Sequence, residues 1–189
     1  PERIGRFRVT QVLGVGGFGL VVSAEDDELG GSVAIKILDS NWASDPEIRK
    51  RFIDEARLLR SVSNDHLVTV HDIGELEDGR PYFVLDLADR GTLADRLMDL
   101  HGVDASSLKA IVNALYQSLV AMHGAGFVHR DVTPKNLLIK RMGSAGRIAD
   151  RNAPTTARAG LVGTDERIVL GDLGLAKDVV TSSKATVIG

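Results

Sequence analysis

The stretch from His129 to Asn136, His-Arg-Asp-Val-Thr-Pro-Lys-Asn, places the strongest constraint on how this chain can fold. It follows a long amphipathic helical pattern and precedes the apolar run 137–139, which predicts a loop between a helix and a strand. So many polar groups beside a buried strand are unfavourable unless they are paired or used. Asp131 could accept a proton from an attacking hydroxyl, and Asn136 could offer its carboxamide oxygen to a hard cation. The stretch therefore predicts a catalytic loop.

A second motif, Gly-Asp-Leu-Gly at 171–174, follows the apolar run 168–170. Its carboxylate, Asp172, would complete a magnesium site with Asn136, since magnesium takes a few oxygen ligands together with phosphate. Each motif alone could equally be an ordinary polar turn. Together, in this order and each beside a strand, they resemble the catalytic loop and the metal-binding motif of the protein kinase family.

The resemblance implies an α+β, protein-kinase-like two-lobed fold. Residues 1–87 would form the smaller, ATP-covering lobe, a five-stranded antiparallel sheet with one helix. Residues 88–189 would form part of a mainly helical larger lobe, which is incomplete here. This part would carry the catalytic loop, an insertion at about 141–166 and the start of the activation loop.

Composition excludes several other classes of protein. The chain has 189 residues, 43% apolar and 26% charged, which is ordinary for a soluble globular protein. A net charge of −3 argues against a nucleic-acid partner. The absence of cysteine excludes disulfides and thiolate metal sites and fits a cytoplasmic location. No apolar run is long enough for a membrane span, and a first residue other than Met suggests a fragment.

The N-terminal third predicts strands at 7–13, 20–22 and 33–38, with a glycine-rich turn at 14–19. A dinucleotide-binding fold would need a helix to start at the last glycine, whereas β-branched residues follow here. The alternative is a plain hairpin turn. The pattern resembles the kinase loop that covers the ATP phosphates with backbone N–H groups. The nucleotide-binding residues implied here are Leu13, Gly14, Val15, Gly16, Gly17, Phe18, Gly19 and Val21.

Lys36 lies within the apolar strand 33–38, where a lone lysine would ordinarily face solvent. Asp45 and Pro46 open a helix, as N-cap and first-turn residues, and Glu55 falls within its apolar stripe. A carboxylate on a buried face needs a cation. The spacing of Lys36 and Glu55 matches the family's ion pair, which would hold Lys36 against the ATP phosphates. A surface-exposed Glu55 is the alternative.

Two further strands are predicted at 66–74 and 81–86, and the family's hinge would follow them. By resemblance Leu85 is the gatekeeper, and backbone groups of Asp86 and Ala88 would meet the adenine. Ala34, Val21 and Leu138 would sandwich the ring, although sequence alone makes them ordinary core residues. A capping box at 92–95 opens a short helix, and the apolar spacing from Leu108 to Met122 predicts the long helix before the catalytic loop.

The chain departs from the family in three places. Thr133 stands where serine/threonine kinases usually carry a lysine that contacts the transferring phosphate, and Lys135 is the nearest substitute. Leu173 replaces the usual Phe. The segment 140–167 lacks aromatic residues and predicts a flexible insertion, most simply a tolerated surface excursion. Residues 181–186 resemble the start of an activation loop, whose phosphate Arg130 would pair with.

The sequence thus predicts an ATP- and Mg²⁺-dependent kinase acting on serine or threonine hydroxyls of a protein substrate. Asp131 would be the base, Lys36 with Glu55 would hold the phosphates, Lys135 would assist, and Asn136 and Asp172 would bind the metal. Autophosphorylation and self-association are expected possibilities, the latter through the apolar side of the 108–122 helix. The alternatives are a nucleotide-binding pseudokinase or scaffold, favoured by Thr133, and a small-molecule kinase of related fold.

Overall fold

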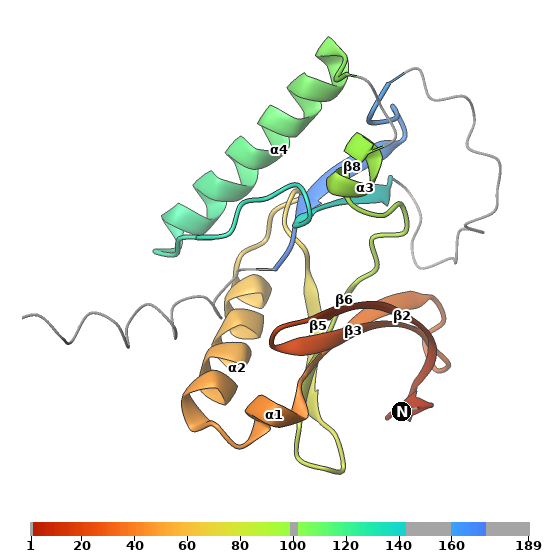
Figure 1. Cartoon of the computed structure of the whole chain (residues 1–189), viewed down its shortest axis with the longest axis vertical. Helices are drawn as coiled ribbons and strands as arrows, with labels where there is room; N and C mark the ends of the chain where they lie inside the picture. The colour runs from red at the N-terminus through yellow and green to blue at the C-terminus, as the bar shows by residue number, and fades with distance from the viewer. Residues whose placement is uncertain (1, 99–101, 143–159, 173–189) are drawn as a thin grey trace, which may run out of the picture.

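The structure is a computed structural model that describes residues 2–98, 102–142 and 160–172. An antiparallel sheet with two helices forms one part of the molecule, and a long helix, a short helix and a hairpin form the other (Figure 1). No helix in these ranges is long and apolar enough to cross a membrane.

The larger sheet has six antiparallel strands in the order β1-β2-β3-β4-β6-β5. Its strands are β1 (Arg3–Ile4), β2 (Phe7–Gly16), β3 (Gly19–Asp26), β4 (Ser32–Leu38), β5 (Val70–Glu75) and β6 (Pro81–Asp86). The two-residue strand β1 adds to the five strands predicted from sequence. Because β2 and β3 pair through Gly16 and Gly19, the glycine-rich turn is a tight hairpin and not the start of a helix.

Two helices accompany this sheet where one was predicted. The predicted helix is α2 (Pro46–Ser61), and its N-cap is Asp45, whose Oδ1 accepts from the backbone N–H groups of Glu47 and Ile48. The additional helix is the short α1 (Ser40–Ala43), which follows β4 directly. Its N-cap Asp39 accepts from the backbone N–H of Asn41.

The other part contains α3 (Leu93–Met98), α4 (Ala105–Gly124) and a hairpin of β7 (Leu137–Arg141) and β8 (Glu166–Leu170). The predicted capping box forms at α3, where Thr92 and Asp95 exchange backbone-to-side-chain hydrogen bonds. An isolated bridge between Leu67 and Leu170 ties the chain that precedes β5 to the hairpin.

A continuous apolar core runs through both parts. It packs buried side chains of α2 and β6, such as Phe52 and Phe83, in one cluster with Met122 of α4 and Ile139 of β7. A second cluster, around Ile35 of β4, gathers side chains of β1 to β4 and β6. The core therefore fixes the hairpin, and the site residues at its ends, relative to the sheet.

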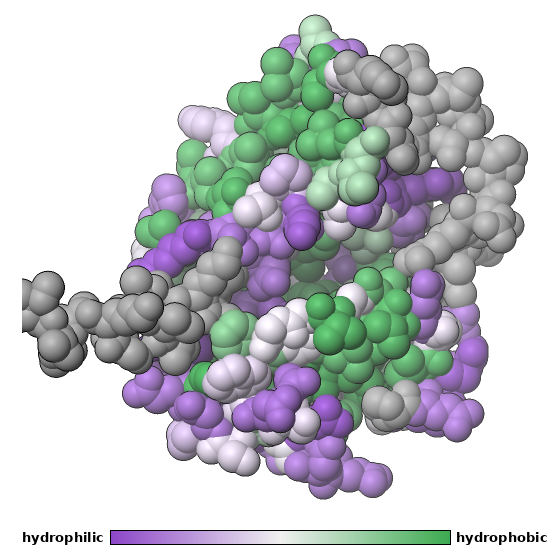
Figure 2. All heavy atoms as spheres, in the orientation of Figure 1, coloured by the Kyte–Doolittle hydropathy of each residue, from purple (hydrophilic) through white to green (hydrophobic). Residues whose placement is uncertain are grey.

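Helix α4 buries one face and leaves a second apolar stripe exposed. Ser107, Ala114, Ser118 and Met122 are buried, whereas Leu108, Val112, Tyr116 and Val120 are between 52% and 64% exposed. Figure 2 shows apolar side chains gathered over this helix. We call these four exposed residues the outer stripe. The apolar residues predicted to lie on one side of this helix therefore lie on two faces, since Leu108 belongs to the outer stripe and Met122 to the core.

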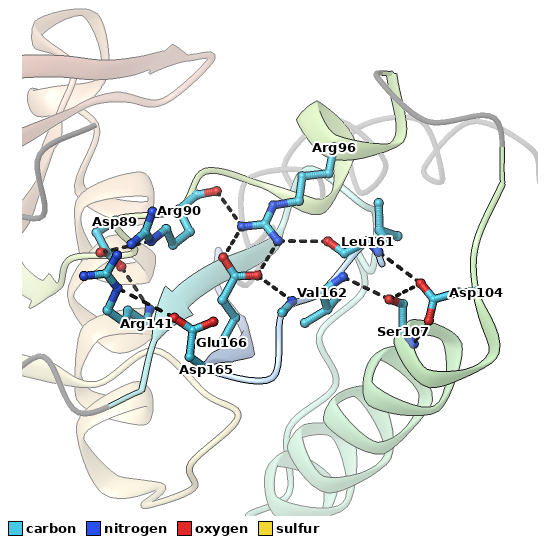
Figure 3. A network of polar contacts seen from close by, with 11 residues as sticks. Asp89, Arg90, Arg96, Asp104, Ser107, Arg141, Leu161, Val162, Asp165 and Glu166 are labelled. Carbon is cyan, nitrogen blue, oxygen red and sulfur yellow. Dashed lines mark hydrogen bonds and ion pairs between the residues drawn. The ribbon is translucent and has the colours of Figure 1, made fainter. Parts of the chain in front are cut away.

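The region predicted as a surface insertion is anchored at its C-terminal end. Arg141 pairs with Glu166 in the hairpin, Leu161 is buried, and its backbone N–H donates to Asp104 Oδ2 at 3.0 Å. Arg96 of α3 holds Glu166 through both terminal nitrogens, at 2.5 and 2.7 Å, in a network that Figure 3 shows. The stretch 160–166 is therefore packed against α3 and α4 and is no loose excursion; residues 143–159 lie outside the described ranges.

Candidate active site

Lys36 of β4 lies between two carboxylates that come from distant parts of the chain. Its Nζ is 3.0 Å from Glu55 Oε1 of α2 and 2.9 Å from Asp172 Oδ1, which follows β8. The Lys36 and Glu55 side chains are 14% and 5% exposed, whereas that of Asp172 is 54% exposed. The expected contact between Lys36 and Glu55 is thus present, and Lys36 makes a second ion pair with Asp172.

The surroundings of Lys36 keep its ammonium charged. Burial by itself lowers the pKa of Lys36, but the charges and hydrogen bonds of Glu55 and Asp172 outweigh this effect and raise the pKa above its ordinary value. The ammonium also lies 5.6 Å from the ring centre of Phe83 and 6.0 Å from that of Phe52. A fixed positive charge therefore faces the space between the sheet and the hairpin.

The loop after α4 is held by His129, which is almost completely buried. His129 Nε2 lies 3.0 Å from the backbone oxygen of Gly171, and this contact must be a donation because a carbonyl only accepts. Its Nδ1 accepts from the backbone N–H of Asp131 at 3.3 Å. One imidazole thus ties the residue before Asp172 to the loop that carries Asp131.

Asn136 closes the same loop from the other end. Its Nδ2 donates to the backbone oxygen of Asp131 at 2.8 Å and to Asp131 Oδ2 at 3.1 Å. Its backbone oxygen accepts from the N–H of Gly171 at 2.9 Å. The two predicted motifs, far apart in sequence, are therefore joined by a backbone hydrogen bond as well as by His129.

Backbone strain is concentrated at these motifs. Among the described non-glycine residues, positive φ angles occur at Arg130 (63°) and Asp172 (45°). This conformation is uncommon for residues with a Cβ and persists only where the surroundings enforce it. Both residues belong to the motifs singled out from the sequence.

Asp172 and Asn136 form a donor set suited to a hard cation. Both residues line one cavity, and the bond from Asn136 Nδ2 to Asp131 leaves the carboxamide oxygen as the atom available to a cation. The described residues contain no cluster of three or more His, Cys, Asp or Glu that could hold a metal alone. Magnesium fits this set, since it is commonly bound by one or two protein oxygens together with phosphate and water.

A cavity of about 600 Å³ lies between the sheet and the hairpin. Its walls include apolar residues from the sheet and from β7, and its charged end is formed by Lys36, Glu55 and Asp172. Most of the residues predicted to bind nucleotide or metal line it: Leu13, Gly14, Val21, Ala34, Lys36, Glu55, Leu85, Asp86, Ala88, Lys135, Asn136, Leu138 and Asp172.

The remaining predicted residues lie outside the cavity lining. Asp131 belongs to the adjoining loop, and Val15 is 77% exposed. In the rest of the glycine-rich turn, Gly17 and Phe18 contact Trp42 of α1, Gly19 pairs with Leu38 of β4, and Gly16 pairs with Gly19. The backbone oxygen of Thr133 accepts from the backbone N–H of Asn136 at 3.0 Å. This contact does not depend on the side chain at position 133.

Sequence reasoning missed several residues of the cavity wall. They are Gln11, Val12, Leu59, Val68, Phe83, Leu87, Asp89, Arg90, Gly91, Thr92, Asp95 and Gly171. The apolar members look like any core residue in the sequence. Thr92 and Asp95 carried a visible signal, the capping box, which indicated a helix start but not a position at a cavity.

A polar cluster at the end of β6 was not predicted. Asp86 accepts from Lys140 Nζ of β7 at 2.6 Å, and its Oδ1 is 2.7 Å from His71 Nε2 of β5. Burial raises the pKa of Asp86, but the hydrogen bonds from His71 and Lys140 outweigh this effect and lower the pKa to about 2. The backbone that was predicted to meet the adenine is therefore braced through the Asp86 side chain, which contacts one side chain of β5 and one of β7.

An antiparallel sheet and a helical part, with a cavity between them and a lysine bridging two carboxylates at its end, define a kinase-type architecture. A family model described as "Protein kinase domain" matches residues 7–189. The chain belongs to the protein kinase family, and the predicted fold class is confirmed. The division after residue 87 stays a prediction.

Several of the proteins to which this chain is similar come from bacteria. The serine/threonine-protein kinases PknL and PknA of Mycobacterium tuberculosis are each 34% identical, over 167 and 175 residues. These matches cover 88% and 87% of this chain but only 41% and 40% of the relatives, so the chain spans about two fifths of their length. The crystal structure of the Mycobacterium tuberculosis PknI kinase domain superposes with a TM-score of 0.66 at 26% identity, covering 92% of this chain and 61% of that one.

Proposed function

We propose that this protein is an ATP-dependent kinase that transfers the γ-phosphoryl group to serine or threonine hydroxyls of protein substrates. The observation that carries the proposal is the position of Lys36, which contacts both Glu55 and Asp172 at the end of the cavity. The names of the relatives support serine and threonine as the acceptors. Catalysis of this transfer depends mainly on positioning and on charge stabilisation, for which such a site is suited.

Each residue has a role that follows from its place. Lys36, kept cationic by its carboxylates, holds the phosphates. Asp131 orients the acceptor hydroxyl and takes its proton, and the bond from Asn136 holds its carboxylate. Lys135 lines the cavity and is exposed, so it supplies a second cation near the phosphates. Leu85 to Ala88 and Leu138 form the adenine pocket.

Asn136 and Asp172 hold Mg²⁺ in this proposal. The ion would neutralise charge on the phosphates and fix their orientation. Asp172 already contacts Lys36, so the same carboxylate would link the protein's fixed cation to the bound one.

Nucleotide binding and phosphoryl transfer can be tested separately, binding on this chain, which could itself be inactive in transfer, and transfer on a chain that continues through the rest of the larger lobe. Mg-ATP at about 100 times its dissociation constant should stabilise the fold by about 2.7 kcal/mol, visible as a rise in melting temperature. ATP with a chelator should stabilise the fold less, and Asp172→Asn should remove most of that difference. If Mg-ATP does not raise the melting temperature, the nucleotide site is refuted.

Phosphoryl transfer is measured with labelled ATP and a peptide containing serine and threonine. Asp131→Asn should leave the Mg-ATP stabilisation unchanged and slow the transfer about 10²- to 10⁴-fold. Equal rates in parent and variant would remove Asp131 from the mechanism.

A nucleotide-binding pseudokinase is the second candidate. Thr133, at a position where the family usually carries a lysine, is the feature that favours it. It predicts Mg-ATP stabilisation without any Asp131-dependent transfer, and Thr133→Lys would then be the variant that restores transfer.

A further inference from the structure

The short helix α1 contacts the tip of the glycine-rich turn. Trp42 Nε1 donates to the backbone oxygen of Gly17 at 2.8 Å. The Trp42 ring also packs on Phe18, with centroids 5.3 Å apart and planes inclined by 30°. One side chain therefore holds both residues at the tip.

A second contact holds the next carbonyl of the turn. The backbone N–H of Asp39, the N-cap of α1, donates to the oxygen of Phe18 at 2.9 Å. Because Asp39 also caps the helix that carries Trp42, the two donors come from one ordered segment. The outer carbonyls of the turn are thus both held by donors from within the protein.

The stem of the turn has little freedom to move. A Cβ built on Gly19 would lie 2.3 Å from the backbone oxygen of Ile37, so the chain passes β4 at a distance that only glycine permits. At the tip, by contrast, a Cβ on Gly17 would meet nothing within 4 Å. The stem is therefore restrained by close packing against β4, whereas the tip is restrained by its contacts with α1.

Holding a carbonyl fixes the N–H of the same peptide plane. In a trans peptide the C=O and N–H point in opposite directions, so the bond from Trp42 to Gly17 determines where the N–H of Phe18 points. Backbone N–H groups of such a turn are the donors that a phosphate would use. The indole thus orients the N–H of Phe18, the group that would bind phosphate, by holding the carbonyl at the opposite edge of the same peptide unit.

We propose that Trp42 is a positioning residue that pre-orders the glycine-rich turn for nucleotide phosphates. The inference rests on the proposed ATP site and adds α1 to it. A turn that is ordered before binding loses less conformational freedom when the ligand arrives. Removing the contact should therefore weaken binding of the phosphate-bearing ligand and leave binding of the base and ribose unchanged.

Calorimetry with Mg-ATP and with adenosine tests this inference on the whole chain. Calorimetry is preferred because Trp42 is the only tryptophan, so its replacement removes the intrinsic fluorescence signal. Trp42→Leu, which lacks both the ring and the donor, should weaken Mg-ATP binding about 5- to 150-fold, the range that corresponds to a hydrogen bond plus an aromatic contact. Trp42→Phe keeps the ring and should recover part of this loss. Adenosine binding should change less than about twofold, the size of a surface substitution effect.

Tyr116→Leu, on the outer stripe of α4, is the matched aromatic control and should change neither affinity. Equal weakening of Mg-ATP and adenosine by Trp42→Leu would overturn the inference in favour of a general structural role. Unchanged or tighter Mg-ATP binding would overturn it as well. Absence of Mg-ATP binding to the parent chain would instead refute the nucleotide site itself, and the positioning role with it.

Discussion

Lys140 Nζ lies 2.6 Å from Asp86 Oδ2, and this ion pair joins β7 of the hairpin to the end of β6 in the sheet. His71 of β5 contacts the other carboxylate oxygen. The three residues brace the chain where it passes from the sheet to the helical part. They also set the position of the backbone at the edge of the cavity.

This brace should make stability depend on pH through Asp86. The pKa of Asp86 in the folded protein is about 2, below its ordinary unfolded value of about 3.9. Its contribution to stability is therefore full above about pH 5, begins to shrink near pH 4 and is lost as the pH falls through about 2. The shift corresponds to about 2 kcal/mol.

Urea unfolding of the parent and of Asp86→Asn, measured between pH 6 and pH 2, isolates this contribution. The difference in unfolding free energy should be constant above about pH 5 and should shrink below about pH 4. A difference that does not change with pH would show that the lost stability comes from packing and not from the charge of Asp86.

Lys36 and Glu55 should behave as one unit. Glu55→Gln and Lys36→Met should each weaken Mg-ATP binding, and the double variant should lose less than the sum, with a coupling of about 1–3 kcal/mol. Calorimetric titration of the four proteins gives the cycle. Additive losses would mean that Lys36 is positioned by Asp172 alone.

Arg96 and Glu166 form a buried pair, with side chains 4% and 6% exposed. Arg96→Met should lower the unfolding free energy by about 3 kcal/mol, because a buried carboxylate loses its cation. Arg96→Met combined with Glu166→Leu should recover much of that loss, since an apolar pair needs no charge compensation. Denaturant unfolding measures both. A double variant no more stable than Arg96→Met would show that Glu166 stabilises the fold mainly through contacts other than Arg96, such as that with the N–H of Gly163.

The outer stripe of α4 predicts concentration-dependent self-association, since contiguous exposed apolar residues favour contact with another surface. Val112→Lys with Tyr116→Lys should shift sedimentation toward the monomer, while Leu29→Lys, at an exposed leucine of a distant turn, should not. A parent chain that stays monomeric at high concentration would refute this prediction.

The sequence predicted those features that depend on local pattern. Asp45 with Pro46 signalled a helix start, and Glu55 within an apolar stripe signalled a buried cation, which proved to be Lys36.

The sequence could not predict α1, because four residues show no periodicity. The contacts of Asp86 with His71 and Lys140 could not be predicted either, since these partners lie 15 and 54 residues away and no local pattern marks them. Leu161 and Val162 are only a short apolar pair in the sequence, and the place of Leu161 beside α3 and α4 reveals it as core.

The two ends of the β7–β8 hairpin have different roles, since one carries the candidate catalytic groups and the other leads to the connecting chain. At one end Leu137 pairs with Leu170 next to Asn136 and Asp172, and at the other Arg141 pairs with Glu166, with Met142 donating to the Asp165 oxygen at 2.8 Å. Residues added or removed between Met142 and Gly160 lie beyond the Arg141–Glu166 end, and each added residue raises the entropic cost of closing the connection only slowly. The hairpin thus gives evolution, or a protein engineer, a place to splice in sequence while the spacing of the catalytic groups stays the same.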